Sequence, residues 1–462
     1  AAVAAANTVN RYTWDPTLSG DPNVIECGDP SSASKLDNEM TRMTNELRFT
    51  TNWDGIVNLA GGVFVEDFEI KHIGDFNYNA PYRAGWAPID INSSSTFANS
   101  PANARGVLTD ATQFRNDNLR EESQVAFFGE ASFQLSDELN VAVGARRYDL
   151  DYDFQGYGAW RYGNRPIAVD DNDSTNDVRP TKTGGRDYGT NFSGLRPLNT
   201  EDTMMKFTVS FTPSDDTLFY ATWSEGYRPG ILNRKGGAVN GDGTYTVPNV
   251  VDSDTVTNYE MGWKTVSMDG TLRFNGSMFL MDIEGLQTTI FDPNITNLFF
   301  SDNAADAEIT GIEGDFAYFT SVDGLSVSGA FSSLHSEMTK KLVPTDDVIV
   351  GDELAFAPSF QANLNIRYEW PLSGGNVGHF MPQVTYTEDS FSDVITINRA
   401  VNPGYTKVDI RAGFSNEDLT AEVYIDNLTD ERGVINNNFV FDRERVSYIR
   451  PTTIGLRVKK NF

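Results

Sequence analysis

The residue types that perform most enzyme chemistry are scarce in this sequence of 462 residues. It contains one cysteine, Cys27, and three histidines, His72, His335 and His379. One cysteine cannot form a disulfide within the chain, and three scattered histidines are too few for a histidine-based metal site. No serine, histidine and aspartate are spaced in a way that indicates a catalytic triad. We therefore expect a protein that is not an enzyme and that holds no resident cofactor or metal.

Acidic residues dominate the charged side chains, since 65 Asp and Glu against 36 Lys and Arg give a net charge of −29. This charge repels a phosphate backbone and argues against a nucleic-acid partner. The acidic segment 170–177 could attract calcium, but it lacks the glycine at position six and the glutamate at position twelve of a calcium-binding loop. A solvated acidic loop is therefore the favoured interpretation of this segment.

Aromatic and cationic side chains gather in one polar segment, residues 154–203, although cations are few in the chain. They are Tyr157, Trp160, Arg161, Tyr162 and Arg165. Guanidinium groups beside aromatic rings suit an anionic, partly apolar ligand, or a sugar stacked on a ring. The alternative is that these residues only pack the loop against itself. Tyr227 and Arg228 are the next candidates for ligand contact, although Arg228 is better suited to brace the following Pro229-Gly230 turn or an acidic residue.

The elements that position these residues are expected to be β-strands, because apolar and polar residues alternate with a period of two. Between residues 360 and 370, one face carries Phe, Ala, Leu, Ile, Tyr and Trp, and the other carries Gln, Asn, Asn, Arg and Glu. The same alternation recurs at 124–135, 205–212, 407–414 and 419–426. Helical patterns of comparable length do not occur. The sequence therefore predicts an all-β fold.

Strand length and connections favour a membrane-spanning barrel over a soluble sandwich. The apolar faces run longer than the roughly 5–6 residues of an ordinary strand, and aromatic residues border them. Short turns of Asp, Gly, Ser and Asn alternate with long polar segments, as periplasmic turns alternate with extracellular loops in outer-membrane barrels. No stretch approaches ~18 consecutive apolar residues, which excludes a helical span. We predict a transmembrane antiparallel β-barrel.

The alternation predicts fifteen strands, or sixteen if the first residues hold another. They lie near residues 43–52, 56–69, 122–135, 139–152, 204–213, 217–224, 256–266, 271–285, 307–319, 325–335, 358–370, 376–386, 404–414, 418–427 and 448–462. Residues 1–42 are expected to form an extracellular loop or a residual strand, and residues 43–462 the barrel. An odd count that begins outside the membrane predicts that further strands precede this sequence, since bacterial single-chain barrels have even numbers.

Five motifs resemble those of TonB-dependent outer-membrane receptors. They are FYATWSEGYRPG at 219–230, NYEMGWK at 258–264, AEITGIEG at 307–314, VYIDNLTDER at 423–432 and RPTTIGLRVKKNF at 450–462. The fourth motif departs from the family pattern, because a tyrosine is absent after Arg432. The resemblance covers about 205–462, whereas residues 43–153 match in strand and turn pattern only.

The resemblance implies the last fifteen strands of a 22-stranded barrel, with a plug domain and a TonB-engaging box outside this sequence. It implies a receptor in the outer membrane of a Gram-negative bacterium that captures a scarce, bulky nutrient, foremost a ferric siderophore, and imports it with energy supplied by TonB. Charged residues of the lumen are then expected to dock the plug: Glu260, Lys264, Glu313, Asp315, Arg367, Glu369, Asp409, Arg411 and Glu422. Phe462 is expected to present the barrel to the insertion machinery. A passive porin and a soluble acidic adhesin are the alternatives.

Overall fold

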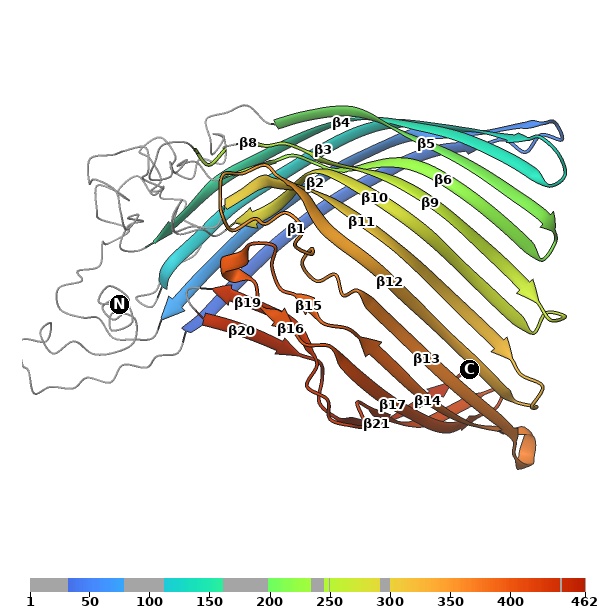
Figure 1. Cartoon of the computed structure of the whole chain (residues 1–462). Helices are drawn as coiled ribbons and strands as arrows, with labels where there is room; N and C mark the ends of the chain where they lie inside the picture. Colours follow the sequence, from blue (N-terminus) through green and yellow to red (C-terminus); the bar gives the residue numbers. More distant parts are fainter. Residues whose placement is uncertain are drawn as a thin grey trace, which may run out of the picture.

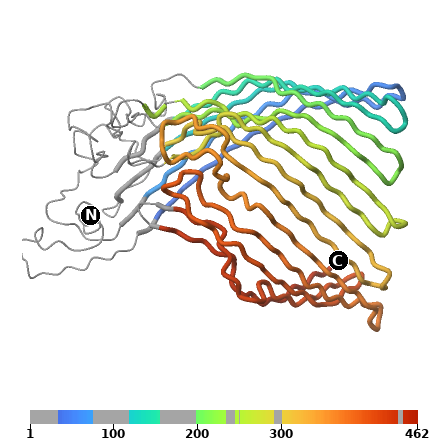
Figure 2. Tube along the Cα trace, in the orientation of Figure 1, coloured from blue at the N-terminus to red at the C-terminus, as the bar shows by residue number. Residues whose placement is uncertain are grey.

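The chain folds into one curved antiparallel sheet of fifteen strands (Figure 1). The computed structural model describes residues 32–78, 112–160, 198–233, 245–248, 250–290, 300–440 and 443–461. Strand neighbours in the sheet follow the order of the chain, and Figure 2 shows them running side by side from the loop end to the turn end. This up-and-down order confirms the prediction of an all-β, antiparallel architecture.

All fifteen predicted strands are present in the predicted order. Their bounds are β1 Ser32–Thr50, β2 Val57–Tyr78, β3 Thr112–Gln134, β4 Leu139–Trp160, β5 Leu198–Ser214, β6 Thr217–Arg228, β9 Asp254–Ser267, β10 Leu272–Ile290, β11 Phe300–Phe319, β12 Leu325–Lys341, β13 Phe360–Pro371, β14 Val377–Thr387, β17 Tyr405–Ser415, β18 Leu419–Asp426 and β21 Thr453–Lys460. Short turns join them at one end. The longer connections lie at the other end, as the alternation of short and long segments predicts.

Three two-stranded sheets lie in the long connections and were not expected from the sequence. They pair β7 (Ile231–Leu232) with β8 (Val250–Val251), β15 (Ser390–Phe391) with β16 (Val401–Asn402), and β19 (Val434–Val440) with β20 (Arg443–Tyr448). Two 3-10 turns, Ser373–Gly375 and Thr396–Asn398, complete the elements of the described chain. The hairpin of β19 and β20 corrects the last predicted strand, which begins at Thr453 and not near residue 448.

Several strands extend further toward the loop end than the sequence predicts. β1 begins at Ser32, β2 continues to Tyr78 and β3 begins at Thr112, so parts of the predicted loops are strand. Polar residues interrupt the apolar alternation in these extensions, and ion pairs such as Lys71 Nζ to Glu69 at 2.7 Å replace it. Because the prediction depended on apolar alternation, it ended each strand where the polar residues begin.

One face of the sheet is apolar and exposed, which is the reverse of a soluble β-protein. The exposed fractions of Phe127, Leu364 and Leu456 are 59%, 40% and 69%. Leu364 faces Gly329 of β12 on one side and Val384 of β14 on the other, so the apolar residues are in register across strands. A continuous exposed apolar face on a long antiparallel sheet is typical of contact with lipid. Within the described residues, no helix has the length and apolar character to cross a membrane.

The largest buried apolar cluster lies among the long connections and strand ends of β10, β11 and β12. It consists of Val247, Ile290, Phe300, Ala304, Ala305, Met338, Val343, Val348, Val394 and Ile395. The connections at 342–359 and 388–404 also contact each other through a hydrogen bond from Phe356 N to Phe391 O at 2.8 Å. These connections therefore pack as one unit on the ends of the strands.

Candidate functional site

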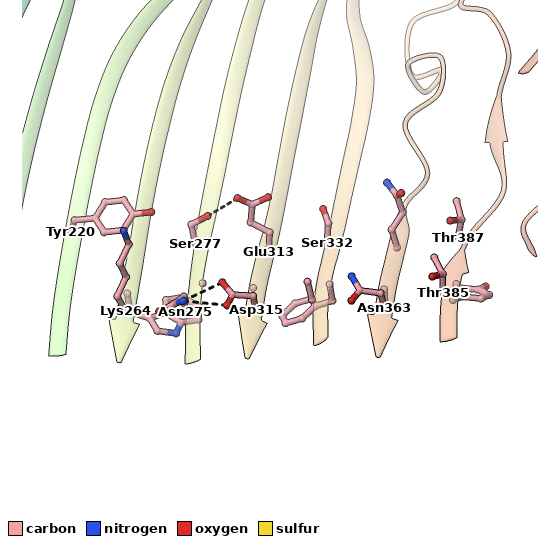
Figure 3. A pocket seen from close by; sticks show the side chains of 18 residues that line it. Tyr220, Lys264, Asn275, Ser277, Glu313, Asp315, Ser332, Asn363, Thr385 and Thr387 are labelled. Atoms are coloured by element: carbon pink, nitrogen blue, oxygen red, sulfur yellow. Dashed lines mark hydrogen bonds between the residues drawn. The ribbon is translucent and has the colours of Figure 1, made fainter. Parts of the chain in front are cut away.

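The nine charged residues predicted to line the lumen share the polar face of the sheet, which we call the lumen face. The register shows this on β9, β10 and β11, where Lys264 lies opposite Asn275 and Asn275 lies opposite Asp315. Asn275 Nδ2 donates to Asp315 at 3.2 Å, and Ser277 Oγ donates to Glu313 at 3.4 Å (Figure 3). Asp315 also pairs with Arg273 of β10 at 3.5 Å, so the carboxylates of this part of the lumen face have neutral and cationic partners on the adjacent strand.

A cavity of about 540 Å³ lies against this part of the lumen face, with Tyr220, Lys264, Asn363 and Thr385 in its lining (Figure 3). Tyr220 of β6 belongs to the FYATWSEGYRPG motif but was not among the predicted site residues, and its hydroxyl donates to Glu260 at 2.5 Å. The sequence signal for Tyr220 was its even-numbered position in the alternating run 219–224, which places it on the polar face of the strand. Donors and acceptors are mixed in this lining, so the cavity suits a polar protein surface. Among the described residues, no cluster of His, Cys, Asp and Glu could hold a metal ion.

A second polar group crosses the last strands as one lateral row. Glu369, His379, Gly413, Glu422 and Arg457 lie opposite one another in turn on β13, β14, β17, β18 and β21. His379 Nε2 lies 3.1 Å from Glu422 Oε2, and the His379 residue is only 2% exposed. The two side chains meet across β17 because Gly413, between them, has no side chain. Nothing near His379 in the sequence indicates a partner for it, so only the register reveals this pair.

Cations pair with carboxylates along the same strands. Arg367 Nε donates to Glu369 at 2.8 Å, and Lys407 Nζ lies 2.9 Å from Asp409. Arg411 lies 3.6 Å from a carboxylate oxygen of Asp426. The lumen face of β13 to β21 therefore carries both signs of charge in alternation, in contrast to the more acidic face of β9 to β11.

Tyr227 and Arg228 end β6 at the loop end of the sheet. The Tyr227 ring stacks on Tyr148 with 3.9 Å between centroids and 8° between planes, and its hydroxyl accepts a hydrogen bond from Gln124 at 2.8 Å. Arg228 donates from Nε to Asp254 at 3.0 Å. Both side chains therefore have protein partners at the rim, and the Arg228 pair matches the bracing interpretation of this residue.

The remaining candidates lie wholly or partly outside the described residues. Arg161, Tyr162, Arg165 and Phe462 are not described. Tyr157 and Trp160 belong to the last residues of β4, for which the structure describes the backbone alone. Their role in binding a ligand stays a prediction.

The chain matches a family model described as "TonB dependent receptor-like, beta-barrel" over residues 4–428. A curated relative, the ferric-pyoverdine 358 receptor of Pseudomonas putida, is 21% identical over 249 residues, which are 54% of this chain and 24% of that protein. The matched part of this chain therefore spans about a quarter of the relative's length.

Solved structures of similar shape support the same fold for this chain. The ferric yersiniabactin uptake receptor FyuA from Yersinia pestis has a TM-score of 0.65 at 15% identity, covering 94% of this chain and 56% of that one. The ferric citrate transporter FecA in its unliganded form has a TM-score of 0.62 at 13% identity, covering 95% and 56%. This chain thus spans little more than half of each. Because the family model covers most of the sequence, the chain belongs to the TonB-dependent receptor β-barrel family of the outer membrane.

Proposed function

We propose that this chain forms the larger part of the wall of an outer-membrane receptor that captures an iron chelate, foremost a ferric siderophore, and imports it into the periplasm with energy supplied through TonB. The observation that carries the proposal is the pairing of a lipid-facing apolar surface with an ion-paired lumen face on a sheet of this family. The relatives named above are a ferric-pyoverdine receptor, a ferric yersiniabactin receptor and a ferric citrate transporter, which supports an iron chelate as the ligand class.

The sheet geometry supports a barrel closed by further strands. Fifteen strands alternate in direction, so β1 and β21, at the two ends of the strand order, run the same way. Antiparallel closure between them requires an odd number of additional strands. Seven more would make the 22 of a plugged outer-membrane transporter.

The lumen face supports docking of a plug domain. A wall of paired charges and neutral hydrogen-bonding groups can hold a folded domain by polar contacts, without the apolar seal that would make release costly. Glu260, Lys264, Glu313, Asp315 and the charges on β13 to β18 are the proposed docking residues. Partners then include the TonB complex, outer-membrane lipid and, through Phe462, the barrel-insertion machinery.

Transport in cells that express the intact receptor tests the function. Uptake of radiolabelled iron presented as ferric pyoverdine, ferric yersiniabactin or ferric citrate should be saturable for at least one of them and should stop in cells that lack TonB. Uptake that continues without TonB would indicate a passive porin. A chain recovered from cells without detergent would instead indicate a soluble adhesin.

A set of loop substitutions tests the proposed capture surface. Changing Trp160, Arg161, Tyr162 and Arg165 to Ala should weaken binding of the transported chelate by about tenfold or more, since each desolvated contact is worth about 1 kcal/mol. Heat-modifiable migration of the barrel should be unchanged, because in the sequence these residues come at or after the last residue of β4. The matched control changes the aspartates of segment 170–177 to Asn. Unchanged binding would show that the capture surface lies elsewhere, and Tyr227 and Arg228 would be the next candidates.

A further inference from the structure

One side chain of β10 holds both ends of the connection between β6 and β9, residues 229–253. Gln287 donates from Nε2 to the carbonyl of Pro229 at 2.8 Å and to the carbonyl of Asp252 at 2.9 Å. Pro229 is the first residue of this connection, and Asp252 is next to its last. A single carboxamide therefore joins the point where the chain leaves β6 to the point where it returns to β9.

The backbone of Gln287 adds two bonds to the same place. Its N–H donates to Asp254 Oδ2 at 3.0 Å, and its carbonyl accepts from Arg228 Nη2 at 2.7 Å. Arg228 and Asp254 also pair directly, and they are the last residue of β6 and the first of β9. Gln287 is only 8% exposed, so these bonds, two of them to charged groups, are shielded from water.

A β-bulge lies directly before Gln287 in β10. The register between β10 and β11 shifts on both sides of Leu286, and Gly285 has a φ of +68° that favours glycine. Asn303 of β11 fixes the bulge by donating from Nδ2 to Gly285 O at 2.6 Å, and the same group donates to Asp252 O at 3.0 Å. The bulge and the end of the connection therefore share one amide partner.

Neighbouring contacts extend the attachment along the two ends. Ile231 pairs with Val251 in the small sheet of β7 and β8, and Gly230 N donates to Ser253 Oγ at 3.1 Å. Asn233 Nδ2 donates to Ser301 O at 2.6 Å. The described ends of the connection are thus joined to each other and to β10 and β11, with Gln287 at the centre.

We propose that Gln287 is a positioning residue, which fixes both ends of the 229–253 connection so that it leaves the rim from a rigid base. This inference rests on the proposed receptor function, in which outer connections meet the ligand. A connection whose two ends are fixed before binding loses less conformational entropy when a ligand is captured. The GYRPG segment at 226–230 then has a physical role, since Arg228 and the Pro229 carbonyl are two of the groups that Gln287 holds.

Hydrogen–deuterium exchange of the full-length receptor in detergent micelles tests the assignment without any iron chelate. In the Gln287→Leu variant, the amides at 231–232 and 250–251 should exchange about tenfold faster or more, because the Pro229 carbonyl loses the donor from Gln287 and the Asp252 carbonyl keeps only the one from Asn303. The amides at 258–264, within β9, should keep their rates, and heat-modifiable migration should stay as in the parent. Gln287→Glu, which has the same size but no carboxamide donors, should raise the exchange rates at the two ends by at least as much.

Gln361→Leu is the matched control. It makes the same change on β13, where the side-chain amide lines the cavity and has no hydrogen-bond partner among the described residues. Its exchange at the two ends should equal that of the parent. Unchanged exchange in both Gln287 variants would overturn the proposal, and so would loss of the heat-modifiable barrel, which would assign Gln287 to barrel assembly. Because the exchange measurement needs no ligand, a failure of this proposal can be told apart from a failure of iron-chelate transport.

Discussion

Asn427 and Asp409 join two neighbouring strands at the start of the last long connection: the backbone N–H of Asn427 donates to Asp409 Oδ1 at 2.7 Å. Asn427 is 1% exposed and has a φ of +55°, a conformation that asparagine tolerates better than most residues. Its Nδ2 donates to the carbonyls of Glu431 at 2.9 Å and Arg450 at 2.8 Å. One buried residue therefore sets the beginning and the end of the connection between β18 and β21, which accounts for the asparagine in the VYIDNLTDER motif.

Replacing Asn427 by Ala should destabilise the barrel by about 2 kcal/mol or more. The change leaves two carbonyls without their donor and puts alanine at a positive φ. The midpoint of urea unfolding in detergent micelles measures the effect. Asn363→Ala is the control, because the only hydrogen bond of the Asn363 side chain in the described structure is with Asn365 at 3.3 Å. Equal midpoints for the two variants would show that Asn427 does not hold the connection.

Replacing Leu364 by Arg should cost about 2–4 kcal/mol, whereas Asn363→Arg should be nearly neutral. Leu364 lies on the exposed apolar face, and the neighbouring Asn363 lies on the lumen face against the cavity. A guanidinium in lipid must be desolvated, but one in the lumen stays hydrated. Unfolding free energies of the two variants in lipid vesicles are the measurement. Similar costs on the two faces would contradict the orientation of the sheet.

Gly413→Ala should destabilise the last strands by about 1–3 kcal/mol, because a Cβ there would lie 2.2 Å from the carbonyl oxygen of Ala421. It would also lie 2.8 Å from the Cα of Glu422. The fraction of heat-modifiable protein in outer membranes reports the loss. In the control, Gly129→Ala, the nearest atom would be 3.8 Å away, so no loss is expected. A loss of the same size in Gly129→Ala would show that these strands require glycine for another reason.

The pH should change the stability of the connection between β14 and β17 through Asp393. Burial raises the pKa of this carboxyl above its ordinary value of 3.8, and hydrogen bonds from the backbone of Ile395 and Val394 offset only part of the rise. The folded connection therefore binds the proton more tightly than the unfolded one. Its stability is highest below the ordinary pKa and falls as pH rises through the raised pKa.

Exchange protection at the Ile395 amide, corrected for intrinsic rates, should thus be greater at about pH 4 than at about pH 7. Asp393→Asn keeps the acceptor that Ile395 N–H uses at 2.9 Å but cannot titrate, so the difference should disappear. A variant with the same pH dependence as the parent would assign the effect to another group.

The number, order and turns of the fifteen strands could be predicted from the sequence, because they depend on local properties. Alternation such as that of residues 360–370 marks a strand with two different faces, and Asp, Gly, Ser and Asn mark the tight turns. The same parity placed Glu313 and Arg411 on the lumen face. Where polar residues replaced the apolar set, as in β2 beyond residue 69, the local signal ended before the strand did.

The tertiary structure alone decided which side chains meet. His379 and Glu422 are 43 residues apart and pair only because the register places Gly413 between them. Gln287 reaches the carbonyls of Pro229 and Asp252, which lie 58 and 35 residues from it in the chain. Both contacts depend on cross-strand register. The register is not encoded in the period of the sequence, since a shift of one residue would preserve the period and change every partner.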